Sequence, residues 1–386
     1  MSIILVLGFT FIAAAIVGKI TNRFRLSSVT GYIISGVLIG LIFPSVRTLF
    51  TIDSLKVFDM FVISILAFMI GGELEISRLR SLPKGVLRLV VVQALVTFLL
   101  VAGAVLLSGQ SIGFSMCLGA IGAASAPATT LMMVKKRNAK GEFVDTLLPL
   151  VALDDAITVI LATVAIAFAM STESLGSVIG AIGLSLWEIL GALVIGAVTG
   201  IVLGYLIRYT KGGDELLFLV LGIVFLGTGI ASMMRASTII TGLVSGATVA
   251  NLVVGHRKLF SSLERFIPPF YVVIFTLAGI LFEPSVFWSS IPLFLIYMVA
   301  RTIGKIVGTK FGVTINKGDK KVANHLGIAI LSQSGLAVAL AIGVYGMIPE
   351  YSQLILSIMV PAVIAFEFIS PSLINFALDK AKDIDK

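Results

Sequence analysis

Two adjacent aspartates, Asp154 and Asp155, lie inside an apolar stretch that reads Pro-Leu-Val-Ala-Leu-Asp-Asp-Ala-Ile-Thr over residues 149–158. A carboxylate near the centre of a bilayer costs roughly 2.5–3.5 kcal/mol on insertion scales, so such residues face protein, water or an ion. Neighbours on a helix point about 100° apart, and the two carboxylates therefore meet different partners. The pattern indicates that one acid contacts a neighbouring helix while the other faces a cavity, where it binds a proton or a cation.

Two other interpretations of the acid pair remain open. The stretch could consist of two shorter segments with Asp154 and Asp155 in a surface loop, although losing one crossing would invert the alternation of basic residues further along the chain. The two acids could also form a buried pair with a purely structural role.

Lys305 is the natural counter-charge for these acids. It lies in a second apolar stretch, and Arg301 precedes it by four residues, so both point from one face of a helix. Burial and a neighbouring carboxylate act in opposite directions on the proton affinity of a lysine, so a cation that displaces Lys305 from its partner can release its proton. Alternatively, both basic side chains extend to the membrane surface. Arg301 could also pair with Glu367, the acid inside the last apolar stretch.

Two apolar stretches contain signals that break a helix. The first reads Gly-Ala-Ala-Ser-Ala-Pro-Ala-Thr-Thr over residues 122–130 and places Pro127 at mid-membrane depth, where proline removes a backbone donor. The second places Ser332, Gln333, Ser334 and Gly335 at matching depth. Discontinuous helices in equivalent positions of two halves are typical of transporter sites. An ordinary proline kink or a packing seam of small residues is the alternative for each.

The amino-acid composition indicates which kind of secondary structure positions these residues. The 386 residues are 58% hydrophobic and 12% charged, whereas a soluble domain carries roughly 25% charged residues. Apolar runs of roughly 20 residues recur along the chain, and each is long enough to cross a bilayer. The runs are continuously apolar rather than alternating, which favours an all-α membrane protein over a barrel. We predict about thirteen spans, over residues 2–20, 28–43, 57–73, 86–108, 112–134, 144–171, 186–208, 215–234, 236–254, 267–282, 286–312, 324–347 and 353–378.

The basic residues predict the orientation of these spans. Most of the 28 Lys and Arg residues fall on one side, and outside the spans only Arg47, Lys56 and Arg235 fall on the other. Basic loops stay in the cytoplasm, so we expect the N-terminus outside, the C-terminus in the cytoplasm and the chain in the plasma membrane. The net charge of +8 is therefore mainly a topology signal rather than a sign of nucleic-acid binding, and the basic loops can attract anionic membrane lipid.

Cysteine and histidine usage excludes several kinds of site. Cys117 is the single cysteine, so no disulfide or thiolate metal site can form within one chain. His256 and His325 stand in short basic connections without other ligand-type residues at suitable spacing, so we expect no metal centre and no cofactor. Isolated loop histidines of this kind are usually solvated side chains rather than pH sensors.

These residues together resemble the monovalent cation:proton antiporter family, in particular the electrogenic sodium/proton antiporter branch, which is related to Kef-type potassium efflux antiporters. The resemblance rests on the span pattern, the break at Pro127, the pair Asp154-Asp155 and the helix of Lys305. It implies a homodimer with two inverted six-helix repeats joined by a linker helix, and two broken helices that cross in the core. It also implies that Asp155 is the main carboxylate for cation and proton, and that Asp154 pairs with Lys305.

The resemblance implies a division of the chain as well. Residues 1–82 and 211–284 correspond to dimerisation-domain helices of the two repeats. Residues 83–172 and 285–386 correspond to core transport helices, and residues 173–210 to the linker helix. The crossing motif of this branch often reads Thr-Ser-Pro, whereas this chain has Ser-Ala-Pro at residues 125–127. One hydroxyl is missing, which leaves Ser125, Thr129 and Thr130 as candidate cation ligands and leaves the choice among sodium, potassium and lithium open.

The sequence thus predicts a transporter, not an enzyme, that exchanges sodium ions for protons by alternating access. A Kef-type potassium/proton antiporter, a sodium-coupled solute symporter and a cation channel are the alternatives on the same fold. An intramembrane aspartyl protease needs two aspartates that converge from different helices, which Asp154 and Asp155 cannot do.

Overall fold

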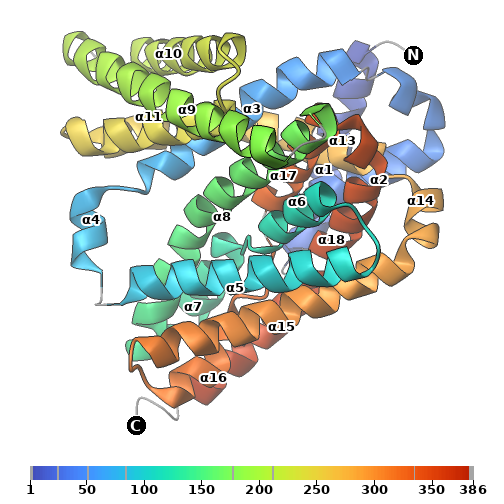
Figure 1. Cartoon of the computed structure of the whole chain (residues 1–386), viewed down its shortest axis with the longest axis vertical. Helices are drawn as coiled ribbons and strands as arrows, with labels where there is room; N and C mark the ends of the chain where they lie inside the picture. Colours follow the sequence, from blue (N-terminus) through green and yellow to red (C-terminus); the bar gives the residue numbers. More distant parts are fainter. Residues whose placement is uncertain are drawn as a thin grey trace.

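The chain folds into an all-α membrane protein in the computed structural model (Figure 1). The structure describes residues 3–23, 26–49, 52–82, 85–175, 178–210, 213–333 and 335–381, and these contain helices but no strand. Within helices, the description leaves out the side chains of residues 3, 22, 48, 49, 52–59, 171–175, 178–185, 320 and 321, and Lys56 is among them. The predicted site residue Ser334 also lies outside the described residues.

The helices follow one another along the chain with short connections. Their bounds are α1 Ile3–Arg23, α2 Ser28–Ile42, η1 Pro44–Leu49, α3 Ile52–Gly72, α4 Ile76–Ser81, α5 Val86–Leu107, α6 Ile112–Gly122, α7 Pro127–Arg137, α8 Glu142–Leu175, α9 Val178–Leu206, η2 Ile207–Tyr209, α10 Asp214–Met233, α11 Thr238–Leu252, α12 His256–Phe266, α13 Pro268–Leu281, α14 Pro284–Ser289, α15 Ile291–Ile315, α16 Lys320–Ala329, α17 Gly335–Met347, η3 Pro349–Tyr351 and α18 Ser352–Ala381.

Eight helical segments in the described residues are long and apolar enough to cross a membrane, and the pair α12–α13, bent by 50°, makes a ninth. Four shorter apolar helical segments, Ser28–Ile42, Met60–Gly72, Thr238–Leu252 and Gly335–Met347, fall within further predicted spans, and Met60–Gly72 is the part of α3 whose side chains are described. The multi-pass all-α architecture is therefore confirmed. The number of thirteen spans remains a prediction, because each of these four segments has fewer than 18 described residues.

The helices form two sets that meet along α8 (Figure 1). In one set, α5 packs against α6, α8 and α15, while α16 packs against α15 and α18. In the other, α2 packs against α1 and α13, and α11 packs against α3 and α9. Contacts of α8 with α9 and of α17 with α3 join the sets. This grouping supports the predicted division into core and dimerisation helices, which stays a prediction.

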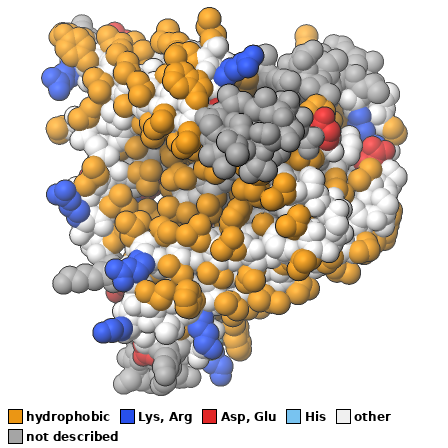
Figure 2. Space-filling view, in the orientation of Figure 1, with side chains coloured by type: hydrophobic (Ala, Val, Ile, Leu, Met, Phe, Trp, Pro, Cys, Tyr) orange, Lys and Arg blue, Asp and Glu red, His pale blue; other side chains and the backbone are white. Residues whose placement is uncertain are grey.

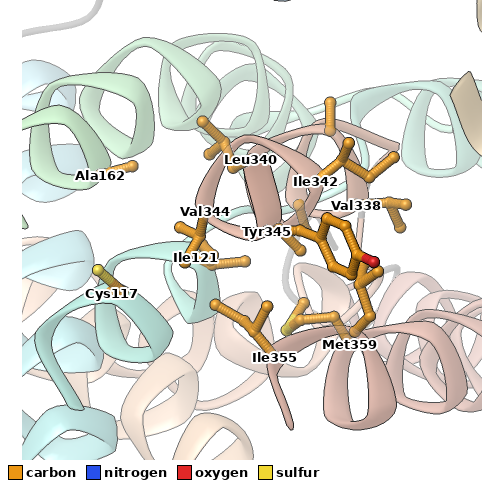
Figure 3. Packing of buried hydrophobic residues seen from close by; sticks show 14 of the residues in the cluster. Cys117, Ile121, Ala162, Val338, Leu340, Ile342, Val344, Tyr345, Ile355 and Met359 are labelled. Atoms are coloured by element: carbon orange, nitrogen blue, oxygen red, sulfur yellow. The ribbon is translucent and has the colours of Figure 1, made fainter. Parts of the chain in front are cut away.

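A buried apolar cluster surrounds the half-helix α17. Residues 337–346 of α17 are all buried, and Figure 3 shows Val344 and Tyr345 packed between Ile121 of α6 and Ile355 and Met359 of α18. A helix that is apolar on every face and buried on every face lies in the interior of a bundle. This cluster therefore fixes the position of the second broken helix within the protein rather than at its lipid-facing surface.

The outer surface is apolar over a wide area. Figure 2 shows hydrophobic side chains spread across most of the visible face, with Lys and Arg side chains mainly along the left and lower edges. Large apolar side chains such as Leu99, Val198, Phe218 and Val299 are more than half exposed. Such a surface suits lipid rather than water, because contiguous apolar area of this size is rare on soluble monomers.

A glycine seam brings α5 and α15 into close contact, and the two helices run side by side in Figure 1. Gly304, Gly308 and Gly312 occur at intervals of four residues on α15. A methyl group added at Gly308 would lie 2.8 Å from the carbonyl oxygen of Gln93, and one added at Gly304 would lie 2.9 Å from Cα of Thr97. Small residues let helix backbones approach in membranes, so this seam places Gln93 next to Lys305.

Candidate ion-binding site

The two predicted helix breaks lie against each other at the centre of the protein. Between α6 and α7, residues 123–126 leave the helix, and Pro127 opens α7 at a position where a missing donor costs nothing. The backbone N–H of Ala126 donates to the carbonyl of Ser332 at 3.1 Å, and Ser125 Oγ donates to the carbonyl of Ile330 at 3.1 Å. The extended segments therefore cross and hold each other.

Arg301 ties both breaks together from α15. Its Nε donates to the carbonyl of Gly122 at 3.0 Å, and its Nη1 donates to the carbonyl of Leu331 at 2.7 Å. Its Nη2 donates to the carbonyls of Ala124 at 2.7 Å and Ser332 at 3.2 Å. The side chain is completely buried. Carbonyls released by two interrupted helices thus surround one guanidinium, which supplies donors in a planar fork.

The predicted ion pair between Arg301 and Glu367 is not formed among the described residues. The N–H groups of Arg301 donate to backbone carbonyls, and its Cζ lies 4.3 Å from the centroid of the Phe366 ring. Phe366 directly precedes Glu367 in the chain. The Glu367 carboxylate instead accepts a hydrogen bond from Thr129, at 3.2 and 3.1 Å to its two oxygens, and further hydrogen bonds from Ser27. The prediction failed because it assigned Arg301 a charged partner, whereas broken helices offer carbonyl acceptors.

Lys305 forms an ion pair with Asp154, with Nζ and Oδ2 separated by 2.8 Å and both side chains fully buried. The same ammonium donates to Ser125 Oγ at 2.8 Å, to Gln93 Oε1 at 3.2 Å and to the carbonyl of Ala123. Lys305 therefore does not extend to the membrane surface. Its ammonium occupies a cage of oxygen atoms contributed by α5, α8 and the first break.

Gln93 is a site residue that the sequence analysis missed. It is fully buried on α5, and its Nε2 donates to Asp154 Oδ1 while its Oε1 accepts from Lys305. The amide thus contacts both members of the ion pair. One signal could have found it, because a single glutamine interrupts the run Leu-Val-Val-Val-Gln-Ala-Leu in an otherwise apolar span.

The two aspartates face different surroundings, as adjacent helical positions require. Helix α8 continues through both without a break, which excludes a surface loop at this point. Asp154 is fully buried, whereas Asp155 is only partly buried. The charge of Asp155 acts on Lys305 and also on Tyr271 of α13. Asp155 is therefore close enough to interact electrostatically with a residue of each set of helices, Lys305 in one and Tyr271 in the other.

The remaining predicted site residues are distributed around the crossing. Thr129 Oγ1 bonds to Glu367, and Thr130 Oγ1 donates to the carbonyl of Ala126 at 3.3 Å. Gln333 is buried and donates to the hydroxyl of Tyr297 at 2.6 Å. Gly335 begins α17. All three candidate hydroxyls are thus engaged with protein groups in this conformation, and a cation would have to exchange with those contacts.

Two cavities lie at opposite ends of the acid pair along α8. The first measures about 670 Å³ and is lined by residues that include Thr163 of α8 together with Glu188 and Arg235. The second measures about 270 Å³ and is lined by residues that include Ala152 of α8 and Pro127. Asp154 and Asp155 lie between these segments of α8 and line neither cavity. Leu153, next to Asp154 in the chain, also lines the second cavity, which therefore approaches the acid pair more closely along α8 than the first.

Histidine plays no part in this centre, and the described residues contain no cluster of His, Cys, Asp and Glu that could hold a metal ion. His256 is not simply solvated, because its Nε2 lies 3.4 Å from a carboxylate oxygen of Glu75, which corrects the sequence-based expectation for this residue. The pKa of Glu75 is below its ordinary value because Ser77 donates a hydrogen bond to it and because His256 and Arg257 lie close.

Comparison with known proteins places this geometry in context. A family model described as "Sodium/hydrogen exchanger, transmembrane" matches residues 10–378. The chain is 22% identical to the ammonium/H⁺ antiporter subunit AmhT of Alkalihalophilus pseudofirmus, over 97% of this chain and 95% of that protein. It is similar in fold to the sodium proton antiporter MjNhaP1 of Methanocaldococcus jannaschii, with a TM-score of 0.70 and 19% identity over 98% of this chain and 96% of the other. A second structure of that antiporter gives a TM-score of 0.63.

Proposed function

The chain belongs to the sodium/hydrogen exchanger family, whose members are transporters rather than enzymes, and from that premise we propose that it exchanges sodium ions for protons across the plasma membrane by alternating access. The observation that carries the proposal is the sealed ion pair of Lys305 and Asp154 beside the partly buried Asp155. A carboxylate in this position can hold one proton or one cation, but not both, so the two substrates compete for it.

The charges around Asp155 give a reason for coupling. A sodium ion that replaces the proton of Asp155 leaves the net charge there unchanged, but it needs more oxygen ligands than a proton does. The carboxylate of the neighbouring Asp154 can supply one of them, so sodium competes with the Lys305 ammonium for Asp154. Lys305 then leaves Asp154 and releases its proton, and Asp154 becomes free to complete the cation site. Loss of one proton from Asp155 and one from Lys305 for each sodium ion makes the exchange electrogenic.

The two cavities support alternating access as the mode of transport. Each cavity approaches α8 from one end of the acid pair, and neither Asp154 nor Asp155 lines either cavity. A movement of the core helices against the others would connect one cavity at a time. The hydroxyls of Ser125, Thr129 and Thr130, released from their present partners, would then act as cation ligands beside Asp155.

Ammonium is a second candidate substrate. The curated relative is named as an ammonium/H⁺ antiporter subunit. In this chain the Lys305 ammonium is satisfied by oxygens from four residues, which is the coordination that a free ammonium ion also requires. Potassium, as in Kef-type antiporters, remains a third possibility on the same fold.

We also propose a homodimer with the N-terminus outside and the C-terminus in the cytoplasm, in contact with anionic lipid. The asymmetry of basic residues supports the orientation. Exchange of sodium for protons in this orientation would contribute to pH homeostasis.

The test is proton movement in sealed proteoliposomes that contain a pH-sensitive dye, with the membrane potential clamped or left free. We expect sodium to drive proton movement that depends on the potential. If only ammonium or potassium drove proton movement, that ion rather than sodium would be the substrate. An ion flux far above the turnover rate of transporters would indicate a channel. No response to any cation would overturn the proposal.

A further inference from the structure

Within the described residues, Gln93 is a neutral side chain that forms hydrogen bonds with both members of the buried ion pair. Its Nε2 donates to Asp154 Oδ1, and its Oε1 accepts from Lys305 Nζ at 3.2 Å. The remaining oxygen of Asp154, Oδ2, lies 2.8 Å from Lys305 Nζ. The three side chains therefore close a ring of hydrogen bonds with a fixed direction. An amide has a donor end and an acceptor end, and here each end meets the charge that it stabilises.

The position of Gln93 is fixed by backbone packing rather than by its own flexibility. The carbonyl of Gln93 lies where Gly308 allows α15 to approach, since a methyl group there would lie 2.8 Å from it. Thr97, one turn later, donates through Oγ1 to the same carbonyl at 2.7 Å. Because α5 and α15 are held at this close spacing, the amide reaches both Asp154 and Lys305 without a gap for water.

Few charged groups act on Lys305, so the neutral amide of Gln93 is the group whose substitution can change the proton affinity of Lys305. The ionisable groups that act on Lys305 are Asp154 and Asp155 of α8 and Arg301 of its own helix. Helices α5, α14, α16 and α18 also pack against α15, and within the described residues they contribute no ionisable group to this set. Gln93 therefore acts on the pair through its dipole alone.

We propose that Gln93 is a positioning residue that holds Lys305 and Asp154 in their ionised forms and thereby sets the pH at which Lys305 gives up its proton. This role rests on the proposed function, in which that proton is exchanged for a cation. If Lys305 discharges, its nitrogen no longer needs a carbonyl acceptor, so the ring of hydrogen bonds favours the charged state. The hydrogen bonds of the Gln93 side chain go to Asp154 and Lys305 rather than to Asp155, so Gln93 acts on transport through the ion pair.

Two substitutions test this assignment because they act in opposite directions. Gln93→Leu removes both ends of the amide at nearly constant volume, so Lys305 loses an acceptor and releases its proton more readily. Gln93→Glu replaces the amide donor with a carboxylate oxygen next to Asp154, and the added negative charge raises the proton affinity of the whole group of side chains, so Lys305 keeps its proton longer. We expect the midpoint of the pH profile of cation-driven proton exchange to fall by about one unit in Q93L and to rise by a similar amount in Q93E, which is the size of effect that one hydrogen bond to a charged group gives.

The matched control is Thr228→Val on α10, which removes a buried hydroxyl that donates to a backbone carbonyl of its own helix and lies outside the contact between α5 and α15. We expect its pH profile to match that of the wild type. If Q93L and Q93E only lower the maximal rate, or if both move the midpoint in the same direction, Gln93 has a packing role and the proposal is wrong.

A second measurement keeps this test separate from the proposed function. The melting temperature of each detergent-solubilised variant is measured from acid to alkaline pH, without any transported cation gradient. Discharge of Lys305 changes the charge of the buried pair, so the dependence of the melting temperature on pH should change slope at a pH that moves in the same opposite directions in Q93L and Q93E. Shifts in melting without any transport would support the role of Gln93 and refute the proposed function. Identical melting profiles in all variants would overturn the inference about Gln93.

Discussion

The hydroxyl of Thr129 bridges both carboxylate oxygens of Glu367, at 3.2 and 3.1 Å, and so joins the first turn of α7 to the middle of α18. Ser27, which caps the N-terminus of α2, also donates to this carboxylate. Glu367 therefore connects a broken core helix with a helix of the other set. Helix N-termini attract negative charge, and two of them meet at this carboxylate.

We expect Glu367→Gln to weaken this connection, because hydrogen bonds to a charged group contribute about 1.5–3 kcal/mol and those to a neutral amide less. Amide hydrogen exchange should become faster at the start of α2 and the start of α7. Thr129→Val is the matched variant, because it removes the link to α7 and leaves the link to Ser27. Unchanged exchange rates at α2 in the Glu367 variant would show that Glu367 does not hold that helix.

Asp155→Asn should abolish cation-driven proton exchange while the protein still folds. The amide has almost the same shape as the carboxylate, but it neither takes up a proton near neutral pH nor balances the charge of a cation. The measurement is dye dequenching in proteoliposomes. Asp145→Asn, an exposed position in the first turn of the same helix, serves as the control and should exchange as the wild type does. Full exchange in the Asp155 variant would remove this residue from the mechanism.

Lys305→Met should destabilise the protein by about 3–5 kcal/mol, because it leaves the Asp154 carboxylate buried without its counter-charge. The double variant Lys305→Met with Asp154→Asn should regain much of that loss, since no buried charge remains. Thermal unfolding in detergent measures both effects.

The same double variant tests the stoichiometry. If Lys305 carries one of the exchanged protons, transport by the double variant becomes insensitive to membrane potential while it still depends on Asp155. Transport that remains potential-dependent would show that Lys305 is structural and that another group carries the proton.

Gly308→Val should separate α5 from α15, because its side chain would meet the backbone of Gln93. We expect a loss of about 1–3 kcal/mol, typical of an overfilled contact, together with loss of exchange. Gly103→Ala on α5 is the control, because nothing lies within 4 Å of a methyl group at that position. Its melting temperature should equal or exceed that of the wild type, since alanine favours a helix more than glycine.

The sequence predicted the intramembrane charges because their cost in lipid is independent of the fold. Asp154, Asp155 and Lys305 are conspicuous in any apolar stretch, and Pro127 marks a break by its own chemistry. The partners of these residues were harder to predict. Arg301 bonds to carbonyls that exist as acceptors only because two helices are interrupted at the same place. Gln93 reaches the ion pair only because three glycines on a distant helix allow close packing.

Helix bounds show a related limit. The predicted spans 112–134 and 324–347 each contain two half-helices with an extended segment between them. Hydropathy is averaged over a window of residues, so it does not distinguish a kinked helix from an interrupted one. Whether the helix is interrupted depends on the hydrogen bonds between the two extended segments, which the sequence does not show. α17 accordingly covers only the second half of its predicted span, whereas α11 is two residues shorter at each end than the predicted 236–254.

The glycine seam has a mechanical consequence. At Gly304 and Gly308 the backbones of α15 and α5 lie so close that an added methyl group would meet the backbone of Thr97 or Gln93, so sliding or rotation of the two helices would drive side chains into this contact. The two helices therefore move as one rigid unit, which includes Gln93 of α5 and both Arg301 and Lys305 of α15. Any displacement that exposes Asp155 to one side of the membrane must therefore bend or shift the protein elsewhere, at the extended segments between half-helices and along the partly buried face of α8.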